Sequence, residues 1–460
     1  MPQIAHFIPY TGTAMGGPVN GMAAYVSLLA DGGWSVAVYS SPCEADGKCI
    51  SLDSRVRMVQ APASCRGGFR RSPDLWRQVQ AADIGLVHSH GLWTDVHRLA
   101  GHLARIRKLP HLLAPCGMLM PGALRHRWWK KVPIRLWFQD RALREAQCLH
   151  AKSEKEYDDI RRFGLRNPIA IIANPIVRPV DQGLRDYGTA GLRDCGTISN
   201  AAKEKAETGN GKAEIKAQPS VSSISSLPSP FSRGQSSVVP QRRTVLFLGR
   251  LHPVKGVGRL VEAWAEIQIK KAESIPLKSR NWESRKQKSA QMTEDGVRRS
   301  GDWQLVIAGP DEAGMRPGLE AALNAAGCGD SVIFTGQLDE QQKWAAYRAA
   351  DLFVMPSDFE NFGNSIVEAM LSGLPVITTT GTPWKELPVQ GAGWCVEPTV
   401  EAVRDALGAA MALSDDARQE MGRRAAVLAA KFSPEQAGAD LIQVYEWMLG
   451  TGPKPGCVVL

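Results

Sequence analysis

Short apolar runs alternate along this chain with stretches in which apolar residues recur at helical spacing. In the first part of the chain, the apolar runs predict strands over residues 3–9, 35–39, 84–88, 111–114, 148–151 and 169–172. An amphipathic helical pattern follows the first run over residues 19–30, and Ser153 opens another one before the last run. Strands and helices that alternate in this way are typical of a parallel sheet covered by helices.

The same alternation resumes in the last part of the chain. Apolar runs predict further strands over residues 244–250, 304–308, 332–335, 352–355 and 375–378. Helices are predicted over residues 260–268, 402–413, 417–431 and 433–449. A chain of 460 residues is long enough for two domains. We therefore predict the α/β fold class, with one domain at residues 1–177, a second at 244–449 and a tail at 450–460.

Two stretches break the alternation. Residues 178–243 contain the imperfect repeat GLRDYGTA and GLRDCGTI and then a run rich in serine and proline, whereas residues 269–301 are rich in lysine and arginine without periodicity. The first composition buries too little apolar surface to offset the entropy of ordering the chain. It is also far longer than a loop in a compact domain. We predict that 178–243 is a disordered linker and 269–301 a disordered insertion.

The net charge of +9 is concentrated in these two stretches. Residues 178–243 hold ten Lys and Arg against six Asp and Glu, and residues 269–301 hold nine against four. The rest of the chain is therefore neutral overall and gives no sign of the basic face that nucleic-acid binding needs. We expect no nucleic-acid partner.

Membrane, secretory and metal signals are weak as well. No run approaches the roughly 20 apolar residues of a membrane helix, and the amino end lacks the features of a secretory signal. The nine cysteines are scattered without a C-x-x-C pair, which argues against a zinc site or a disulfide framework. These observations predict a soluble, cytoplasmic protein.

The clearest candidate for chemistry is MPSDFENFGNSIVEAMLSG at residues 355–373, which leads from a predicted strand into a predicted helix. Ligands of open α/β sheets bind at the carboxyl ends of the strands, and a helix amino end suits an anionic ligand. Glu360 in the loop and Glu368 in the helix carry carboxylates, which accept hydrogen bonds from hydroxyl groups. Alternatively, Ser365 and Glu368 form a capping box with a purely structural role.

Other predicted strand ends carry permissive or titratable residues. Gly16 and Gly17 follow the first strand and let the backbone approach a ligand, although a tight turn without a ligand requires them equally. His88 and His90 stand at the end of the strand predicted over 84–88. They are candidates for chemistry near neutral pH, and structural hydrogen bonding is the alternative.

Arg250 and Lys255 bracket a turn that precedes the helix predicted over residues 260–268. Two cations beside a helix amino end form a suitable site for a diphosphate. The alternative is that both are solvated surface cations.

A basic and aromatic segment, RHRWWKKVPIRLWF, occupies residues 125–138. Tryptophan and lysine together suit the interface between lipid headgroups and water, so the segment is a candidate for peripheral membrane contact. The alternative is a surface helix that packs its tryptophans inward and is interrupted by Pro133.

Taken in order, the motifs resemble the retaining glycosyltransferases of family 4, which have the GT-B architecture. The resemblance covers most of residues 1–177, 244–268 and 303–449, and it rests on the motifs GG, HSHGLW, GML, GRL-x-x-x-KG and E-x7-E. It implies two Rossmann-like domains that face each other across a cleft. It also implies that the last helix, 433–449, crosses back to the first domain.

The resemblance implies roles for individual residues. Glu360 and His90 are the catalytic candidates, both beside the donor sugar. The donor-binding candidates are Arg250 and Lys255 at the diphosphate, Glu368 at the ribose hydroxyls, and Gly16, Gly17, Phe362, Gly363, Asn364, Gly309, Gly336 and Leu338. On the acceptor side, the candidates are Gly117 and Met118.

The implied reaction moves a hexose-type unit from a nucleotide-diphospho-sugar to an acceptor hydroxyl and requires no metal or other cofactor. The expected acceptor is a glycan or a lipid-linked glycan of a bacterial surface polysaccharide, either lipopolysaccharide or exopolysaccharide. We expect the reaction in the cytoplasm, at the inner face of the membrane if the segment 125–138 binds lipid. Two alternatives stay open: a nucleotide-sugar epimerase of the same fold and a non-catalytic protein that binds sugar nucleotides.

Overall fold

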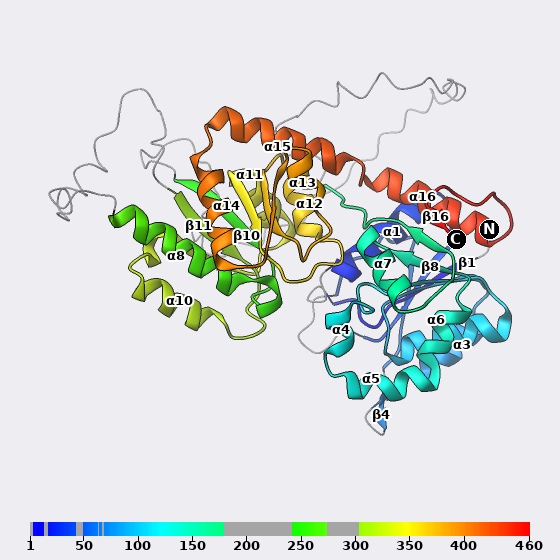
Figure 1. The fold of residues 1–460 in the computed structure, drawn as a ribbon. Coiled ribbons are helices and arrows are strands. Elements are labelled where there is room, and N and C mark those ends of the chain that lie inside the picture. Colours follow the sequence, from blue (N-terminus) through cyan, green and yellow to red (C-terminus); the bar gives the residue numbers. More distant parts are fainter. Residues whose placement is uncertain are drawn as a thin grey trace, which may run out of the picture.

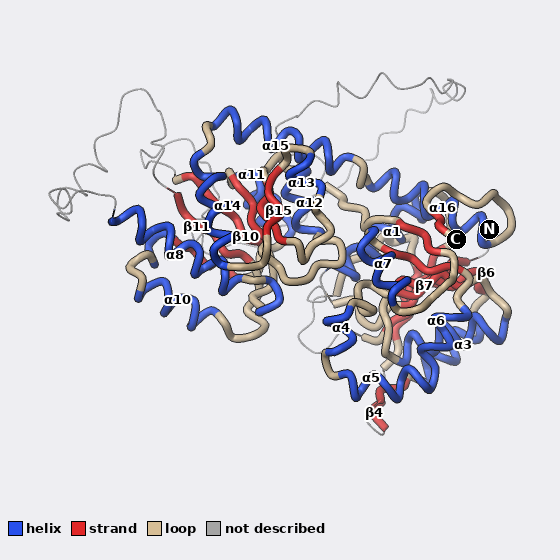
Figure 2. The backbone as a smooth tube through the Cα atoms, viewed as in Figure 1, coloured by secondary structure: helices blue, strands red, loops and turns tan. Residues whose placement is uncertain are grey.

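The computed structural model describes residues 3–12, 17–42, 49–62, 64–66, 69–178, 242–273 and 303–460. The chain forms two mainly parallel sheets, each flanked by helices, and the two domains lie side by side (Figure 1). Figure 2 shows the strands as two separate blocks surrounded by helices. The predicted α/β class with two Rossmann-like domains is confirmed.

The first sheet has the strand order β16-β9-β8-β7-β6-β1-β2-β3. Its strands are β1 (Gln3–Phe7), β2 (Val36–Ser40), β3 (Arg57–Gln60), β6 (Ile84–His90), β7 (His111–Ala114), β8 (Cys148–Ala151), β9 (Ile169–Ile171) and β16 (Val458–Val459). All neighbours pair in parallel except β16, which pairs antiparallel with β9. A separate antiparallel pair is formed by β4 (Ser64–Arg66) and β5 (Phe69–Arg71).

Helices cover both faces of this sheet, so its strands are apolar on both sides. Ile4 of β1 packs into a core shared with helix α1 (Gly17–Asp31), whereas its neighbours Ala5 and Phe7 pack into a core shared with α2 (Pro73–Ala81) and α3 (Asp95–Arg107). A third core holds α6 (Asp140–Glu145) and α7 (Glu154–Arg162). The strong apolar runs of the sequence follow from this double burial.

The second sheet has the order β12-β11-β10-β13-β14-β15 and is parallel throughout. Its strands are β10 (Arg243–Leu248), β11 (Trp303–Ala308), β12 (Val332–Gly336), β13 (Leu352–Met355), β14 (Val376–Thr379) and β15 (Gly393–Val396). The helices around it are α8 (Val257–Glu273), α10 (Arg316–Ala325), α11 (Glu340–Ala349), α12 (Asn364–Leu371), α13 (Glu386–Val389), α14 (Val400–Ala412) and α15 (Asp415–Ala430).

The predicted strands are present with shifts of one or two residues at their ends. The structure differs at the edges of the two predicted disordered stretches, because Arg243 already belongs to β10 and α8 continues to Glu273. The remainder of those stretches, 179–241 and 274–302, lies outside the described residues. The sequence pattern did not predict β3, β15 or β16.

The last helix, α16 (Pro434–Met448), leaves the second domain and packs on the first (Figure 1). Its buried face, which includes Leu441, Val444 and Tyr445, belongs to the same core as α1 and β1. The expected crossing back is therefore confirmed. The residues predicted as a tail continue this return, since β16 adds an edge strand beside β9.

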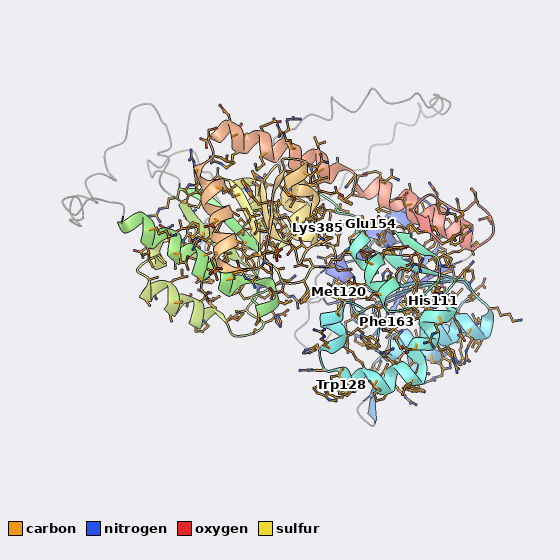
Figure 3. All side chains as sticks on the ribbon, in the orientation of Figure 1. His111, Met120, Trp128, Glu154, Phe163 and Lys385 are labelled. Atoms are coloured by element: carbon orange, nitrogen blue, oxygen red, sulfur yellow. The ribbon has the colours of Figure 1, made fainter. Side chains whose placement is uncertain are left out.

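The basic and aromatic segment is broken into α4 (Pro121–Arg125), α5 (Trp128–Ile134) and a π-helical turn at Arg135–Gln139. Trp128 and Trp129 are 60% and 58% exposed, and Trp128 lies at the periphery of the first domain (Figure 3). These two tryptophans do not pack inward, which contradicts the alternative of an inward-facing surface helix. Among the described residues, no helix is both long and apolar enough to span a bilayer.

Candidate functional site

A cavity of about 470 Å³ lies between the two domains. We call it the interdomain cavity. Predicted site residues that line it are Gly17, His90, Arg250, Lys255, Gly309, Leu338, Glu360, Phe362, Gly363, Asn364 and Glu368. Gly16 lies outside the described residues. The sequence therefore predicted residues from both domains that the fold brings to one place.

The cavity lies at the carboxyl ends of the strands, as expected for open α/β sheets. The chain leaves β13 at Met355, passes Glu360 and enters α12 through Gly363, whose φ of 85° favours glycine. No side chain caps the amino end of α12. The Ile366 N–H donates to the Gly363 carbonyl oxygen at 2.9 Å, which leaves the N–H groups of Asn364 and Ser365 for water or for an anionic ligand.

Glu360 and Lys255 form an ion pair in the wall of the cavity. The Lys255 Nζ lies 2.5 Å from the Glu360 Oε1, and both side chains are mostly buried. The Ser357 hydroxyl donates to the same carboxylate oxygen at 2.9 Å. Since the two charges neutralise each other, the wall combines an oriented acceptor with a cation. A freely solvated surface cation is the wrong description of Lys255.

Arg250 is in a more open position. Its Nη1 lies 2.8 Å from Glu312 Oε2, and its side chain is 47% exposed. It still lines the cavity beside Lys255. The two predicted cations therefore reach the same space, one held firmly and the other at the edge.

Two glycines make this close arrangement sterically feasible. At Gly256, next to Lys255, φ is 69° and a Cβ atom would lie 2.0 Å from the Pro356 carbonyl oxygen. At Gly309, φ is 141° and a Cβ atom would lie 1.9 Å from the Gly249 carbonyl oxygen. Any larger residue at these positions would push strand-end loops apart.

Of the remaining predicted donor residues, Gly336 is not in the cavity wall but supports it. Its carbonyl oxygen accepts from the Gly309 N–H at 2.8 Å, and Gly309 does line the cavity. Leu338 follows two residues later and lines the cavity directly. The strand ends of β11 and β12 thus form one continuous side of the site.

Glu368 is only 8% exposed and is held by two residues that the sequence did not indicate. Lys343 Nζ lies 2.8 Å from its Oε1, and the Tyr347 hydroxyl donates to its Oε2 at 2.8 Å. Both belong to α11. The capping-box alternative with Ser365 is wrong, because α12 begins at Asn364 and the carboxylate points to another helix.

The electrostatics around Glu368 keep its two partners in the forms that bind a carboxylate. Burial opposes the charged form of Lys343, but the carboxylates of Glu368 and Glu340 outweigh it and raise its pKa. Burial, reinforced by Glu368, raises the pKa of Tyr347 well above its usual value. Lys343 therefore stays cationic and Tyr347 stays a phenol that donates a hydrogen bond.

The predicted acceptor-side loop is attached to this site through Glu156, another residue that sequence patterns missed. Its carboxylate accepts from the Gly117 N–H at 2.6 Å, from the Lys152 N–H at 2.7 Å and from the Asn361 amide at 2.9 Å. Glu156 is 1% exposed, and burial raises its pKa. Since Asn361 follows Glu360, this carboxylate links the two domains at the cavity.

Gly117 and Met118 themselves are not in the cavity wall. A Cβ atom on Gly117 would lie 3.1 Å from the Asn361 Cβ, so the loop is packed against the motif that contains Glu360. Met118 contacts the backbone next to the β6 strand end, where its Sδ accepts from the Leu92 N–H at 3.2 Å. Their assignment to the acceptor side stays a prediction.

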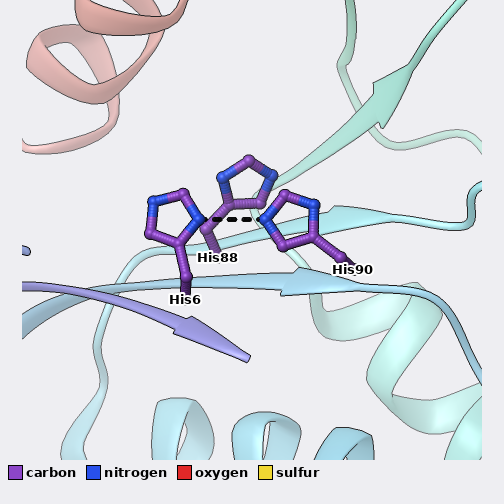
Figure 4. Close-up of side chains that lie close together, drawn as sticks. All are labelled: His6, His88 and His90. Atoms are coloured by element: carbon purple, nitrogen blue, oxygen red, sulfur yellow. Dashed lines mark hydrogen bonds between the residues drawn. The ribbon is translucent and has the colours of Figure 1, made fainter. Parts of the chain in front are cut away.

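The two predicted histidines differ in their access to the cavity. His90 ends β6, is 2% exposed and lines the cavity. Its Nε2 lies 2.9 Å from the Nδ1 of His6 (Figure 4). His88 is fully buried and is bonded to Tyr445 and His150 instead. The structural alternative therefore holds for His88, whereas His90 faces the site.

Two family models match this sequence. Residues 16–175 match the glycosyl transferase 4-like domain, and residues 229–427 match the glycosyl transferases of group 1. Together these segments make up most of the chain.

Curated relatives and a solved structure agree with these matches. The sequence is 30% identical over 206 residues to the alpha-D-kanosaminyltransferase of Streptomyces kanamyceticus, which covers 44% of this chain and 45% of that protein. It is 30% identical over 157 residues to the lipopolysaccharide core biosynthesis mannosyltransferase LpsB of Rhizobium meliloti, covering 32% of this chain and 44% of that protein. The matched parts thus span less than half the length of these two relatives.

The crystal structure of HepE from Anabaena, in complex with UDP and glucose, superposes with a TM-score of 0.62 at 14% identity. It covers 97% of this chain and 100% of that chain. This likeness confirms the GT-B arrangement of the two domains. From its motifs, its two matched segments and its fold, the chain belongs to the group 1 glycosyltransferases.

Proposed function

We propose that the protein is a retaining glycosyltransferase that moves a hexose-type sugar from a nucleotide-diphospho-sugar to an acceptor hydroxyl. The observation that carries this proposal is the interdomain cavity, which is lined both by the ion pair of Glu360 and Lys255 and by the buried Glu368. A nucleotide-sugar has hydroxyl groups at both ends and a diphosphate between them. The cavity offers carboxylates for the hydroxyl groups and cations for the diphosphate.

The diphosphate would lie against Lys255, Arg250 and the amino end of α12. As the glycosidic bond to the diphosphate breaks, negative charge develops on the leaving group. Cations and helix N–H groups already aimed at that position stabilise it without reorganisation. Glu368 would accept from the ribose hydroxyls, because Lys343 and Tyr347 occupy its inner side and hold it in place.

The sugar would lie between Glu360 and His90, which approach the cavity from different domains. The contacts of Glu156 with both Gly117 and Asn361 support a reaction in the closed form, in which water is excluded and donor hydrolysis is limited. No residue in this scheme requires a metal or another cofactor.

We assign the acceptor to a glycan or a lipid-linked glycan of a bacterial surface polysaccharide. The name of LpsB, which refers to lipopolysaccharide core biosynthesis, supports this acceptor. The complex of HepE with UDP and glucose supports a nucleotide-sugar donor. The nucleotide, the sugar and the linkage are to be identified by experiment.

A donor screen that measures release of nucleoside diphosphate, with and without lipid-linked acceptors, tests the proposal. We expect release that depends on the acceptor and that falls by at least 10-fold in Glu360→Gln. Isomerised free sugar without an acceptor would instead identify an epimerase. Tight nucleotide-sugar binding without turnover on any acceptor would identify a non-catalytic binding protein.

We also propose that the segment 125–138 contacts the inner face of the cytoplasmic membrane. Trp128, Trp129 and Leu136 are 60%, 58% and 83% exposed and are interspersed with Arg and Lys. Such residues insert at headgroup depth, and basic residues add attraction to anionic lipids. Sedimentation with anionic vesicles should fall in the Trp128→Ser/Trp129→Ser variant. Equal sedimentation of both proteins would refute the contact.

A further inference from the structure

Beneath the interdomain cavity, four histidines and a tyrosine form a continuous buried chain. His6, His88, His90, His150 and Tyr445 are each at most 2% exposed. The first three stand on β1 and β6 (Figure 4), His150 stands on β8, and Tyr445 reaches them from α16. Of these five residues, only His90 lines the cavity, and Lys152, which contacts His150 at the other end of the chain, lines it as well.

The direction of the hydrogen bonds in this chain follows from its inner end. The Nε2 of His150 lies 2.9 Å from the carbonyl oxygen of Ile172, which can only accept. The Nε2 of His150 therefore carries the proton. In a neutral ring the other nitrogen is then an acceptor, so the Nδ1 of His150 accepts from the Nε2–H of His88 at 3.2 Å.

The same argument assigns the donor and the acceptor in each following hydrogen bond. Since Nε2 of His88 donates, its Nδ1 accepts from the Tyr445 hydroxyl at 2.7 Å. The Tyr445 oxygen then accepts from the Nε2–H of His6 at 3.2 Å. The Nδ1 of His6 is left to accept from the Nε2–H of His90 at 2.9 Å. The proton of His90 is thereby assigned to Nε2, and Nδ1 holds a lone pair.

The buried environment keeps the imidazole rings of these histidines neutral. Burial, together with the nearby charge of Lys152, lowers the pKa of His6 to about 3. Burial also lowers the pKa of His88, His90 and His150 well below the usual value. An imidazolium would have two donors and no acceptor, which would break the sequence of bonds.

Among the described residues, Lys152 is the group that could reverse the direction, because its Nζ lies 3.0 Å from Nε2 and 3.3 Å from Nδ1 of His150. Lone pairs on the two ring nitrogens diverge, so an atom close to both is aligned with neither. If Lys152 donated to Nε2, that lone pair would also face the Ile172 oxygen at 2.9 Å without a proton between them. The carbonyl therefore decides the orientation.

The cluster does not have the geometry of a metal site. His6, His88 and His90 offer nitrogen atoms within 4.8 Å of one another. Two imidazoles on a tetrahedral zinc ion, with Zn–N bonds of about 2.0–2.1 Å, place their nitrogens about 3.3 Å apart. The 2.9 Å between His6 and His90 is instead the length of a hydrogen bond. The buried ammonium of Lys152 also opposes a second cation.

We propose that His6 and Tyr445 are positioning residues that hold His90 in its Nε2–H tautomer, so that His90 can only accept a hydrogen bond from a hydroxyl of the donor sugar. This inference rests on the proposed function for the nature of the ligand. The tautomer itself does not depend on that function. A neutral acceptor at this place selects for a sugar that carries an O–H or N–H group there.

The tautomer can be measured directly in the full-length protein labelled with ¹⁵N-histidine. Two-bond ¹H–¹⁵N spectra distinguish Nε2–H from Nδ1–H rings, and the His90→Gln variant identifies the signals of His90. We expect a single Nε2–H form in the wild type and a mixture in Tyr445→Phe. An Nδ1–H form in the wild type, or an unchanged ring in Tyr445→Phe, would overturn the proposal.

Two controls separate positioning from mere stability. Tyr39→Phe removes another buried hydroxyl from the same domain, one that donates to Gln3 at 3.4 Å, and it should leave the His90 spectrum unchanged. His6→Asn keeps an acceptor near the Nδ1 position, whereas His6→Leu removes it. Restoration of the Nε2–H form by Asn but not by Leu supports the relay, and equal spectra for both would contradict it.

Donor analogues test the functional half. Tyr445→Phe should raise the donor KM roughly 3- to 10-fold, the effect of one weakened hydrogen bond, with a smaller effect on kcat. At the hydroxyl whose removal affects the wild type but not His90→Ala, a fluoro analogue should bind no better than a deoxy analogue, because fluorine cannot donate. A fluoro analogue that binds as the parent sugar does would refute the acceptor role.

The experiments distinguish a failure of the proposed function from a failure of the proposed positioning of His90. If no donor is turned over but the Nε2–H tautomer is found, the proposed function fails and the relay stands. If transfer is observed with His90 in the other tautomer, only the relay fails.

Discussion

Lys255 and Glu360 show what a single pair of residues contributes at the cavity. Each was identified from its own motif, and their direct contact at 2.5 Å was not visible in the sequence because about a hundred residues separate them. Lys343, Tyr347 and Glu156 have no motif at all. Their importance comes from where α7 and α11 place them, which single-sequence patterns do not encode.

Replacing Lys255 by methionine removes the cation but keeps most of the side-chain volume. We expect the donor KM to rise by about 10- to 100-fold, because a charged hydrogen bond to phosphate is lost and Glu360 is left unpaired. The measurement is nucleoside diphosphate release against donor concentration. Lys431→Met is the control, since Lys431 pairs with Glu386 at the exposed surface, and it should leave the KM unchanged.

Tyr347→Phe removes one of the two groups that orient Glu368. We expect nucleoside diphosphate to bind roughly 5- to 10-fold more weakly by calorimetry, as one hydrogen bond to a carboxylate is lost. Lys343 still holds the carboxylate at 2.8 Å, so binding should not disappear. Unchanged affinity would mean that Glu368 does not contact the nucleotide.

At the level of elements, most strands were predictable because both faces of each sheet are buried and the runs are strongly apolar. The elements missed were those without such a run. β16 is a two-residue strand that exists only by pairing with β9, and β15 begins at a glycine with a φ of 155°. α8 begins at Val257, three residues earlier than its apolar periodicity indicated.

Gly309 tests how closely the strand-end loops must approach. In Gly309→Ala the added methyl group would lie 1.9 Å from the Gly249 carbonyl oxygen, whereas in Gly314→Ala, also at positive φ, it would meet nothing within 4 Å. We expect Gly309→Ala to lower the free energy of unfolding by at least about 2 kcal/mol more than Gly314→Ala. Denaturant unfolding of both variants provides the comparison, and equal losses would contradict this account.

On the scale of the whole molecule, stability should depend steeply on acid because several histidines are buried in the neutral form. Burial lowers the pKa of His6 and His111 to about 3 and that of His97 to about 4, from 6.5. Between pH 6.5 and these lower pKa values, the unfolded chain binds protons at these histidines, whereas the folded chain does not. The free energy of unfolding therefore falls as pH decreases below 6.5, by about 1.4 kcal/mol per pH unit for each such histidine.

Denaturant unfolding at pH 7.5, 6.5 and 5.5 measures this loss. We expect a smaller decrease between the first two values, because each of these rings is half protonated in the unfolded chain at pH 6.5, and a marked decrease at the third. A His111→Asn variant should show a shallower decrease, since it lacks one histidine that binds a proton only in the unfolded chain. A free energy of unfolding that stays constant down to pH 5.5 would contradict the neutral, buried state of these rings.

The return of α16 and β16 to the first sheet has a consequence for how the protein is made. The strands from β1 to β9 are synthesised before α16 and β16, so their core lacks Leu441, Val444, Tyr445 and Val458 until these two elements have left the ribosome. The second domain is contiguous from β10 to α15 and can fold earlier, although domains usually complete in order from the amino terminus. Tyr445 also belongs to the histidine chain, so a nascent chain cannot orient His90 until α16 has been synthesised and has packed on the first domain.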